Sequence, residues 1–145
     1  MLTQDFEKEK KLKKLVHIDG LTNATNRPLF NDRLKQARVR TKRAKEPISL
    51  MCIDLDKFKE VNDLYGHASG DRYLKMFVAI GQTLIRDADT IELLGGDEFS
   101  VLLLKAVYVD AKHLAQCILE QLNTPKRYWL GLKCRSLYWN GKLSW

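Results

Sequence analysis

The chain has 145 residues, of which 45% are apolar and 30% charged, and its formal net charge is +7. This length suits one domain with one hydrophobic core, and no apolar run approaches the roughly 20 residues of a membrane-spanning helix. Residues 1–7 lack the basic and then apolar pattern of a secretory signal. We therefore expect a cytoplasmic protein with no membrane span in this chain.

The net charge is concentrated at the end of the chain. From residue 121 onward there are five Lys or Arg residues and no acid, whereas residues 1–120 hold 20 bases and 18 acids. A nucleic-acid-binding face more often shows a basic stripe on a recognisable reading element. We see no such element and expect no nucleic-acid partner. Residues 126–145, which also contain all three Trp residues, form a divergent, basic, Trp-rich tail.

The N-terminal part of the chain predicts two helices. Residues 4–16 are rich in helix formers and charges, which indicates either a solvent-exposed helix or a linker from an upstream partner such as a sensor domain. We assign residues 1–18 to this linker helix. A second helix is expected from about Asn26 to Ala44, where Leu29, Phe30, Leu34 and Ala37 recur at helical spacing.

The rest of the chain predicts strands alternating with helices. The apolar run Ile48–Ile53 is typical of a buried strand. A helix over 57–64, a turn over 66–70 and a helix over 71–86 follow, then strands over 90–94 and 98–104 and a helix that Asp110 caps, ending near residue 122. Paired glycines between the two strands indicate a hairpin. This order predicts an α+β fold with helices packed on an antiparallel sheet.

Carboxylates occur at two strand ends. Asp54 follows the first predicted strand, and Asp97 and Glu98 follow Gly95 and Gly96. Burial of an unpaired carboxylate is costly, and Mg²⁺ takes one or two carboxylates together with substrate phosphates. Glycines lack Cβ and let a phosphate approach the backbone. The alternative is an ordinary hairpin turn with surface acids, and the Gly-Gly-Asp-Glu tetrapeptide alone favours that alternative.

Five motifs occur in order along the chain. They are Asp19-Gly-Leu-Thr, Asn26-Arg27, the run from Asp54-Leu55-Asp56 to Asp63, Gly66-His67 with Gly70-Asp71, and Gly95-Gly96-Asp97-Glu98-Phe99. Together they resemble the GGDEF family of diguanylate cyclases over residues 19–125. The resemblance implies a ferredoxin-like or palm-type antiparallel sheet with helices. It also implies condensation of two GTP into cyclic di-GMP and pyrophosphate.

The resemblance also implies residue roles. Asp54 and Asp97, with the carbonyl of Leu55, would hold Mg²⁺ or Mn²⁺, and Asp97 and Glu98 would be the catalytic acids. The substrate-binding residues would be Lys59, Asn62, Asp71, Gly95 and Gly96, with Asn62 and Asp71 reading guanine. Catalysis would require a homodimer, because each domain holds one GTP. Each of these three residues also has a purely structural alternative when it is taken singly. Lys59 alone is typical of a solvated lysine, and Asn62 and Asp71 alone are typical of a turn and a helix cap.

A second ligand site is implied by Arg86 and Asp89. They form an Arg-x-x-Asp motif whose spacing from Gly95 marks, in this family, an inhibitory site for the product cyclic di-GMP. The alternative is an i,i+3 ion pair that closes a helix.

The chain departs from the family pattern at two places. Leu93 stands where the family usually has an arginine, and residues 126–145 lack the motifs of the family's last helix–strand unit. We therefore expect a partial domain in which Ile48–Ile53 lies at an unprotected sheet edge, although Leu132–Tyr138 has a strand pattern. These departures keep an alternative open: a catalytically impaired regulatory module that binds GTP or cyclic di-GMP, or a truncated fragment.

Overall fold

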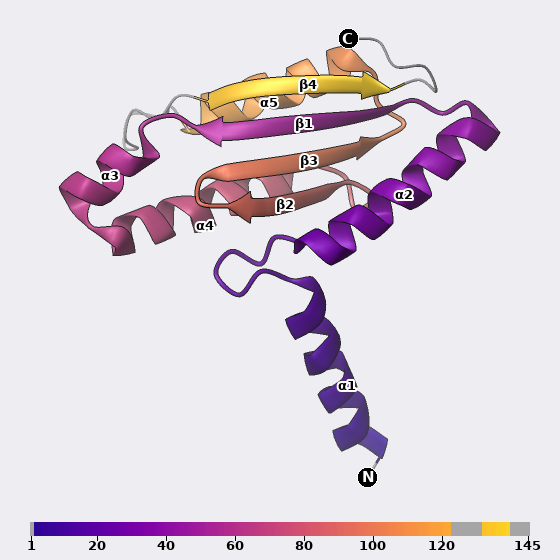
Figure 1. The fold of residues 1–145 in the computed structure, drawn as a ribbon, viewed down its shortest axis with the longest axis horizontal. Coiled ribbons are helices and arrows are strands. Elements are labelled where there is room, and N and C mark those ends of the chain that lie inside the picture. Colours follow the sequence, from indigo (N-terminus) through magenta and orange to yellow (C-terminus); the bar gives the residue numbers. More distant parts are fainter. Residues whose placement is uncertain (1, 123–131, 140–145) are drawn as a thin grey trace.

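The computed structural model describes residues 2–122 and 132–139, and for residues 13–16 and 132–139 it describes the backbone alone. The elements follow in the order that the sequence predicts (Figure 1). They are α1 (Leu2–His17), α2 (Arg27–Ala44), β1 (Ile48–Leu55), α3 (Phe58–Tyr65), α4 (His67–Leu84), β2 (Thr90–Gly95), β3 (Glu98–Leu104), α5 (Tyr108–Leu122) and β4 (Leu132–Trp139).

The strands form one antiparallel sheet in the order β2-β3-β1-β4. This arrangement confirms the predicted α+β class. The expectation that the first strand lies at an unprotected edge was wrong, because β4 pairs with β1 from Ile48 to Leu55. Strand pairing uses backbone groups, so β4 can close this edge without the sequence motifs that the family usually carries there.

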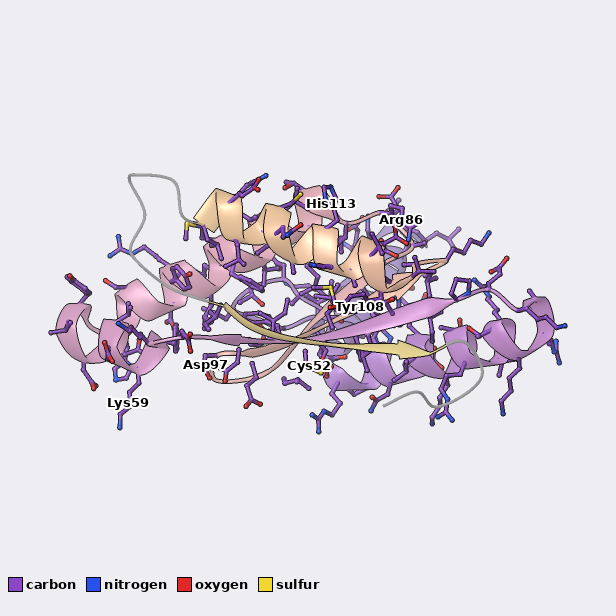
Figure 2. The ribbon with its side chains drawn as sticks, turned by 90° about the horizontal axis from the view of Figure 1, so that it is seen from above. Cys52, Lys59, Arg86, Asp97, Tyr108 and His113 are labelled. Atoms are coloured by element: carbon purple, nitrogen blue, oxygen red, sulfur yellow. The ribbon has the colours of Figure 1, made fainter. Side chains whose placement is uncertain are left out.

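The two faces of the sheet bury different sets of side chains. Alternate residues of a strand point to opposite faces, and Met51, Ile53 and Leu55 belong to the larger core cluster, with residues of α4 and α5. Ile48 and Leu50 belong to a second cluster with residues of α2. Figure 2, a view turned by 90°, shows α4 and α5 on one side of the sheet and α2 on the other.

The α2 face of the sheet is apolar at one end and polar at the other. At the apolar end α2 packs through Phe30 and Ala37 against Ile48 and Leu102. Toward the other end, the same face of β1 and β3 carries paired polar residues: Cys52 opposite Ser100, and Asp54 opposite Glu98. The carboxylates that the sequence singles out therefore lie beyond the cover of the α2 apolar cluster.

Two helix starts differ from the predicted ones. The turn predicted over 66–70 was wrong, because α4 begins at His67 and contains Gly70. A Cβ at Gly70 would collide with the amide of Asn62 in α3, so this glycine allows two helices to approach closely and does not make a turn. α5 begins at Tyr108, and Asp110 lies inside its first turn, where its carboxylate accepts the N–H of Val107 at 2.8 Å.

Candidate functional site

The pairing of β1 with β3 brings the predicted metal residues together. Asp54 lies directly opposite Glu98 in this register. The N–H of Leu55 donates to the backbone carbonyl of Asp97 at 3.2 Å, which binds the turn between β2 and β3 to the end of β1. Phe99 is fully buried after the turn, with its ring centroid 4.4 Å from that of Phe77. The acids therefore occupy a turn that is anchored on both sides.

The turn itself requires its two glycines. Gly95 has φ 146° and Gly96 φ 59°. Residues other than glycine rarely adopt these backbone angles. The register shifts between Leu93 and Gly95, as in a β-bulge. No atom lies within 4 Å of a Cβ placed on either glycine. The backbone of the turn is thus open to a ligand, and the phosphate expected there stays a prediction.

The negative charges of Asp54, Asp97 and Glu98 repel one another at this end of the sheet. Burial raises the pKa of Asp97, and the negative charges of Asp54 and Glu98 raise that pKa further. A divalent cation between Asp54 and Asp97 would remove this repulsion. Among the residues that the structure describes, no group of three or more His, Cys, Asp or Glu side chains is arranged to hold a metal ion. The donor set of two carboxylates and the Leu55 carbonyl still fits Mg²⁺, which commonly keeps waters and takes substrate phosphates.

The first turn of α3 supplies a cation at the same end of the molecule. Lys57 has φ 61° and precedes the helix, so the chain reverses sharply after β1. Lys59 follows and is exposed. Figure 2 shows Lys59 at the end of the sheet where Asp97 lies. An ammonium group in this position suits an anionic ligand held at the turn.

The predicted base-reading residues lie on two adjoining helices. Asn62 belongs to α3 and is half-buried, whereas Asp71 belongs to α4 and is exposed. The close approach of the two helices at Gly70 places the Asn62 amide next to the turn of α4 that carries Asp71. Within the described ranges no hydrogen bond joins Asn62 to Asp71, and their joint role in reading guanine stays a prediction.

Arg86 and Asp89 contact each other in the connection between α4 and β2. The Arg86 Nε lies 3.2 Å from Asp89 Oδ2, and Asp89 also accepts the backbone N–H groups of Arg86 and Leu104. The Asp89 side chain is 2% exposed and that of Arg86 59%. The pair follows the end of α4 at Leu84, so it ties a connection to β3 rather than closing a helix.

A pocket of about 430 Å³ opens beside this pair. Its lining comes from the end of α4, the connection after it, the end of β3 and one side of α5. The lining residues are Leu84, Ile85, Arg86, Asp89, Leu103, Lys105, Ala106, Asp110, His113, Leu114 and Cys117. Figure 2 shows Arg86 and His113 on the side of the sheet that α5 covers, away from Lys59. Any ligand here would therefore be separate from one at the glycine turn.

Glu92 is a buried acid that the sequence reading missed. Its side chain is 2% exposed, its Oε1 lacks a hydrogen-bond partner, and the Arg27 Nε lies 3.6 Å from that atom. Burial raises the pKa of Glu92, while the charge of Arg27 opposes this rise. The only sequence signal was an acid at a buried position of a strand, and the partner lies 65 positions away.

The segment that carries Arg27 also ties α1 to β2. Thr25 donates its N–H and its hydroxyl to the carbonyl of Ile91, at 2.9 and 2.8 Å. Asn26 donates its N–H to the carbonyl of His17 at the end of α1. The connection between the two helices is therefore bonded both to α1 and to the strand that leads into Gly95 and Gly96.

A family model described as "Diguanylate cyclase, GGDEF domain" matches residues 16–133. The chain therefore belongs to the GGDEF family.

Individual relatives agree with this assignment. The diguanylate cyclase TpbB of Pseudomonas aeruginosa is 38% identical over 112 residues, which are 77% of this chain and 26% of TpbB. The diguanylate cyclase DgcS of Shewanella oneidensis is 39% identical over 107 residues, 74% of this chain and 36% of DgcS. A solved microbial GGDEF domain, described in its interaction with cyclic di-GMP, superposes with a TM-score of 0.78 at 30% identity, covering 88% of this chain and 79% of that one. The chain thus spans about a quarter to a third of the two curated relatives.

Over the described ranges 2–122 and 132–139, none of the helices combines the length and apolar character that crossing a membrane requires.

We predict that Glu92→Gln stabilises the protein above acidic pH. A carboxyl whose pKa is raised on folding binds its proton more tightly in the folded state. Its favourable contribution is therefore complete below the ordinary value of 4.5 and is lost as the pH rises through the raised folded pKa. Urea unfolding at several pH values should show the variant gaining on the parent as the pH rises, by on the order of 1 kcal/mol.

The control is Glu46→Gln, since Glu46 is 38% exposed and pairs with Lys105 at the surface. This control should change the free energy of unfolding by less than about 1 kcal/mol at every pH. A Glu92→Gln protein that is less stable than the parent at neutral pH would mean that the ion pair with Arg27 outweighs the burial of the carboxylate.

Proposed function

We propose that this domain binds GTP with Mg²⁺ or Mn²⁺ and, as one half of a homodimer, condenses two GTP into cyclic di-GMP and pyrophosphate. The observation that carries the proposal is the pairing of β1 with β3, which sets the carboxylates of Asp54 and Asp97 against each other beside an open glycine turn. Membership of the GGDEF family supports the same reaction.

Each part of GTP has a suitable group on this chain. The Gly95–Gly96 backbone lets the phosphates approach, and the exposed ammonium group of Lys59 offsets their charge. A carboxylate at Asp71 accepts from the ring N–H and the exocyclic amine of guanine, which adenine does not offer in that arrangement. A site built on such hydrogen bonds rejects the wrong base because its polar groups would be left unpaired.

The reaction needs a nucleophile and a leaving group held in line. The 3′-hydroxyl of one GTP attacks the α-phosphorus of the other, a new P–O bond forms, and the bond to pyrophosphate breaks. A bound divalent cation would neutralise phosphate charge and assist ionisation of the hydroxyl. Asp54, Asp97 and the Leu55 carbonyl hold the cation in this proposal. The exposed carboxylate of Glu98 is available to receive the hydroxyl proton.

Two copies must face each other for this chemistry, because one site holds one GTP. Figure 1 shows α1 projecting from the body of the domain, so α1 is the segment through which an upstream sensor domain would bring two copies together. We expect this to happen in the cytoplasm, where GTP is available.

A second role is product binding at Arg86 and Asp89. Its support is the pocket of about 430 Å³, in which the Arg86 side chain is 59% exposed while Asp89 is held by the backbone. A guanidinium presents paired donors to a phosphate or to a guanine edge. In this proposal the pocket takes cyclic di-GMP, and the alternative of a regulatory module without turnover would rest on the same contacts.

We predict that the chain binds GTP with Mg²⁺ at least about tenfold more tightly than ATP, since each unpaired buried donor or acceptor costs roughly 1–3 kcal/mol. Asp71→Ala should remove this preference. Asp63→Ala, which deletes an exposed carboxylate from α3, should leave it intact. Isothermal titration calorimetry measures all three proteins. Equal affinity of the parent for GTP and ATP would contradict the assignment of guanine as the base.

We predict that turnover depends on bringing two domains together. Alignment of two bound reactants can account for about 7–11 kcal/mol of a barrier, so the chain alone should make little cyclic di-GMP. Fusion of a dimeric coiled coil before α1 should raise synthesis, and Asp97→Asn in that fusion should abolish it. Chromatographic detection of the product provides the measurement. Synthesis by the Asp97→Asn fusion at the parent rate would refute the catalytic assignment.

We predict that Arg86→Ala weakens cyclic di-GMP binding by about tenfold or more, because it removes a charge-assisted contact, and leaves GTP binding nearly unchanged. Asp89 is not a suitable probe, since its carboxylate holds two backbone N–H groups. Lys112→Ala serves as the charge control, as Lys112 is exposed on α5 and is not part of the pocket lining. Unchanged cyclic di-GMP affinity in Arg86→Ala would return the pair to a structural role.

A further inference from the structure

Basic side chains are concentrated along α2. Residues 27–45 contain eight Lys or Arg and one acid, Asp32, whereas the rest of residues 1–120 contains 12 bases and 17 acids. The nearly neutral total over residues 1–120 therefore conceals a separation of charge between one helix and the remainder of the domain.

The outward side of α2 carries more basic than acidic side chains, with Asp32 as the one acid of the helix. The helix buries Phe30, Ala37 and Thr41 against the sheet. Its exposed side carries Lys35, Val39, Lys42 and Arg43, which we call the α2 ridge. Their spacings of three, four and seven residues make them neighbours on one helix face. The helix has 18 residues, so it runs for about 27 Å.

The three cations of this ridge are exposed. Within the part of the chain that the structure describes, Lys35, Lys42 and Arg43 form no ion pair. Asp32, the only acid of the helix, accepts a hydrogen bond from Gln36 at 3.1 Å. Cations in the last turn favour the helix dipole, which gives Lys42 and Arg43 a local role. That role does not extend to Lys35 at mid-helix.

We propose that the α2 ridge docks the domain on the anionic surface of a lipid bilayer. Clusters of Lys and Arg on a helix surface bind anionic headgroups, and each added cation near the surface contributes. Val39 is 49% exposed among the cations. It adds an apolar contact at the headgroup level, as in helices that lie in the membrane interface.

The acids beside α2 favour a flat partner over a nucleic-acid duplex. Asp87 lies with Arg33 and Arg40 in a hollow of about 240 Å³ on one flank of the helix. Glu46 follows the helix and pairs with Lys105 at 3.5 Å. A duplex that takes a helix into its major groove brings phosphates to both flanks, where such acids repel them. A bilayer surface is flat, so it contacts the α2 ridge and not the acids on the flanks of the helix.

The test compares charge removal on the ridge with equal charge removal in the tail. The full chain is sedimented with phosphatidylcholine vesicles that contain or lack phosphatidylglycerol. The ridge variant carries Lys35→Gln, Lys42→Gln and Arg43→Gln. The control carries Lys126→Gln, Arg127→Gln and Lys142→Gln, because the tail is also basic and rich in Trp. Circular dichroism verifies that both variants are folded.

The parent should bind only vesicles with phosphatidylglycerol, and binding should weaken as salt screens the charges. The ridge variant should bind roughly tenfold or more weakly, while the control should stay near the parent. Equal losses in the two variants, or a loss confined to the tail variant, would overturn the proposal. So would tighter binding of the parent to a DNA or RNA duplex than to the vesicles, measured by fluorescence anisotropy. This result does not depend on GTP binding or turnover.

Discussion

The candidate site depends on the register between β1 and β3. Met51 and Ile53 are anchored in the larger core cluster, so the alternate residue Asp54 must face the other side of the sheet, opposite Glu98. A slip of one residue would turn every side chain of β1 to the wrong face. The register is thus held by the burial of apolar side chains, and the carboxylates take their positions from it. The bond from Leu55 N–H to the Asp97 carbonyl then closes the turn onto β1.

The glycines of this domain serve two different physical purposes. Gly95 and Gly96 have positive φ values and leave the space around the turn open. Gly70 is helical, and neighbouring atoms fill the space beside it, since a side chain there would collide with Asn62. The first use admits a ligand to the backbone, and the second lets α3 and α4 pack closely. Both ends of a bound nucleotide would therefore rely on missing Cβ atoms.

Acids that folding leaves in unfavourable surroundings gather along β2 and its turn. Burial raises the pKa of Asp97 and of Glu92, and Asp54 adds like-charge repulsion at Asp97. Arg27 offsets the cost only at Glu92. Perturbed carboxyls of this kind are common at functional sites. The electrostatic cost at Asp97 would be relieved by a bound cation. The cost at Glu92 is already reduced by Arg27.

The sequence by itself determined the elements, the antiparallel α+β class and the residues at the glycine turn. Apolar periodicity is local, and the Gly-Gly-Asp-Glu turn follows from neighbouring residues, so both can be read along the chain. Tertiary structure alone decided that β4 pairs with β1, that Arg27 meets Glu92, and that α2 turns Phe30, Ala37 and Thr41 toward the sheet and leaves Lys35, Lys42 and Arg43 exposed. These outcomes depend on strand order and on contacts between distant residues. A count of charges or a search for turn residues carries no information on either, because it does not say which surfaces meet.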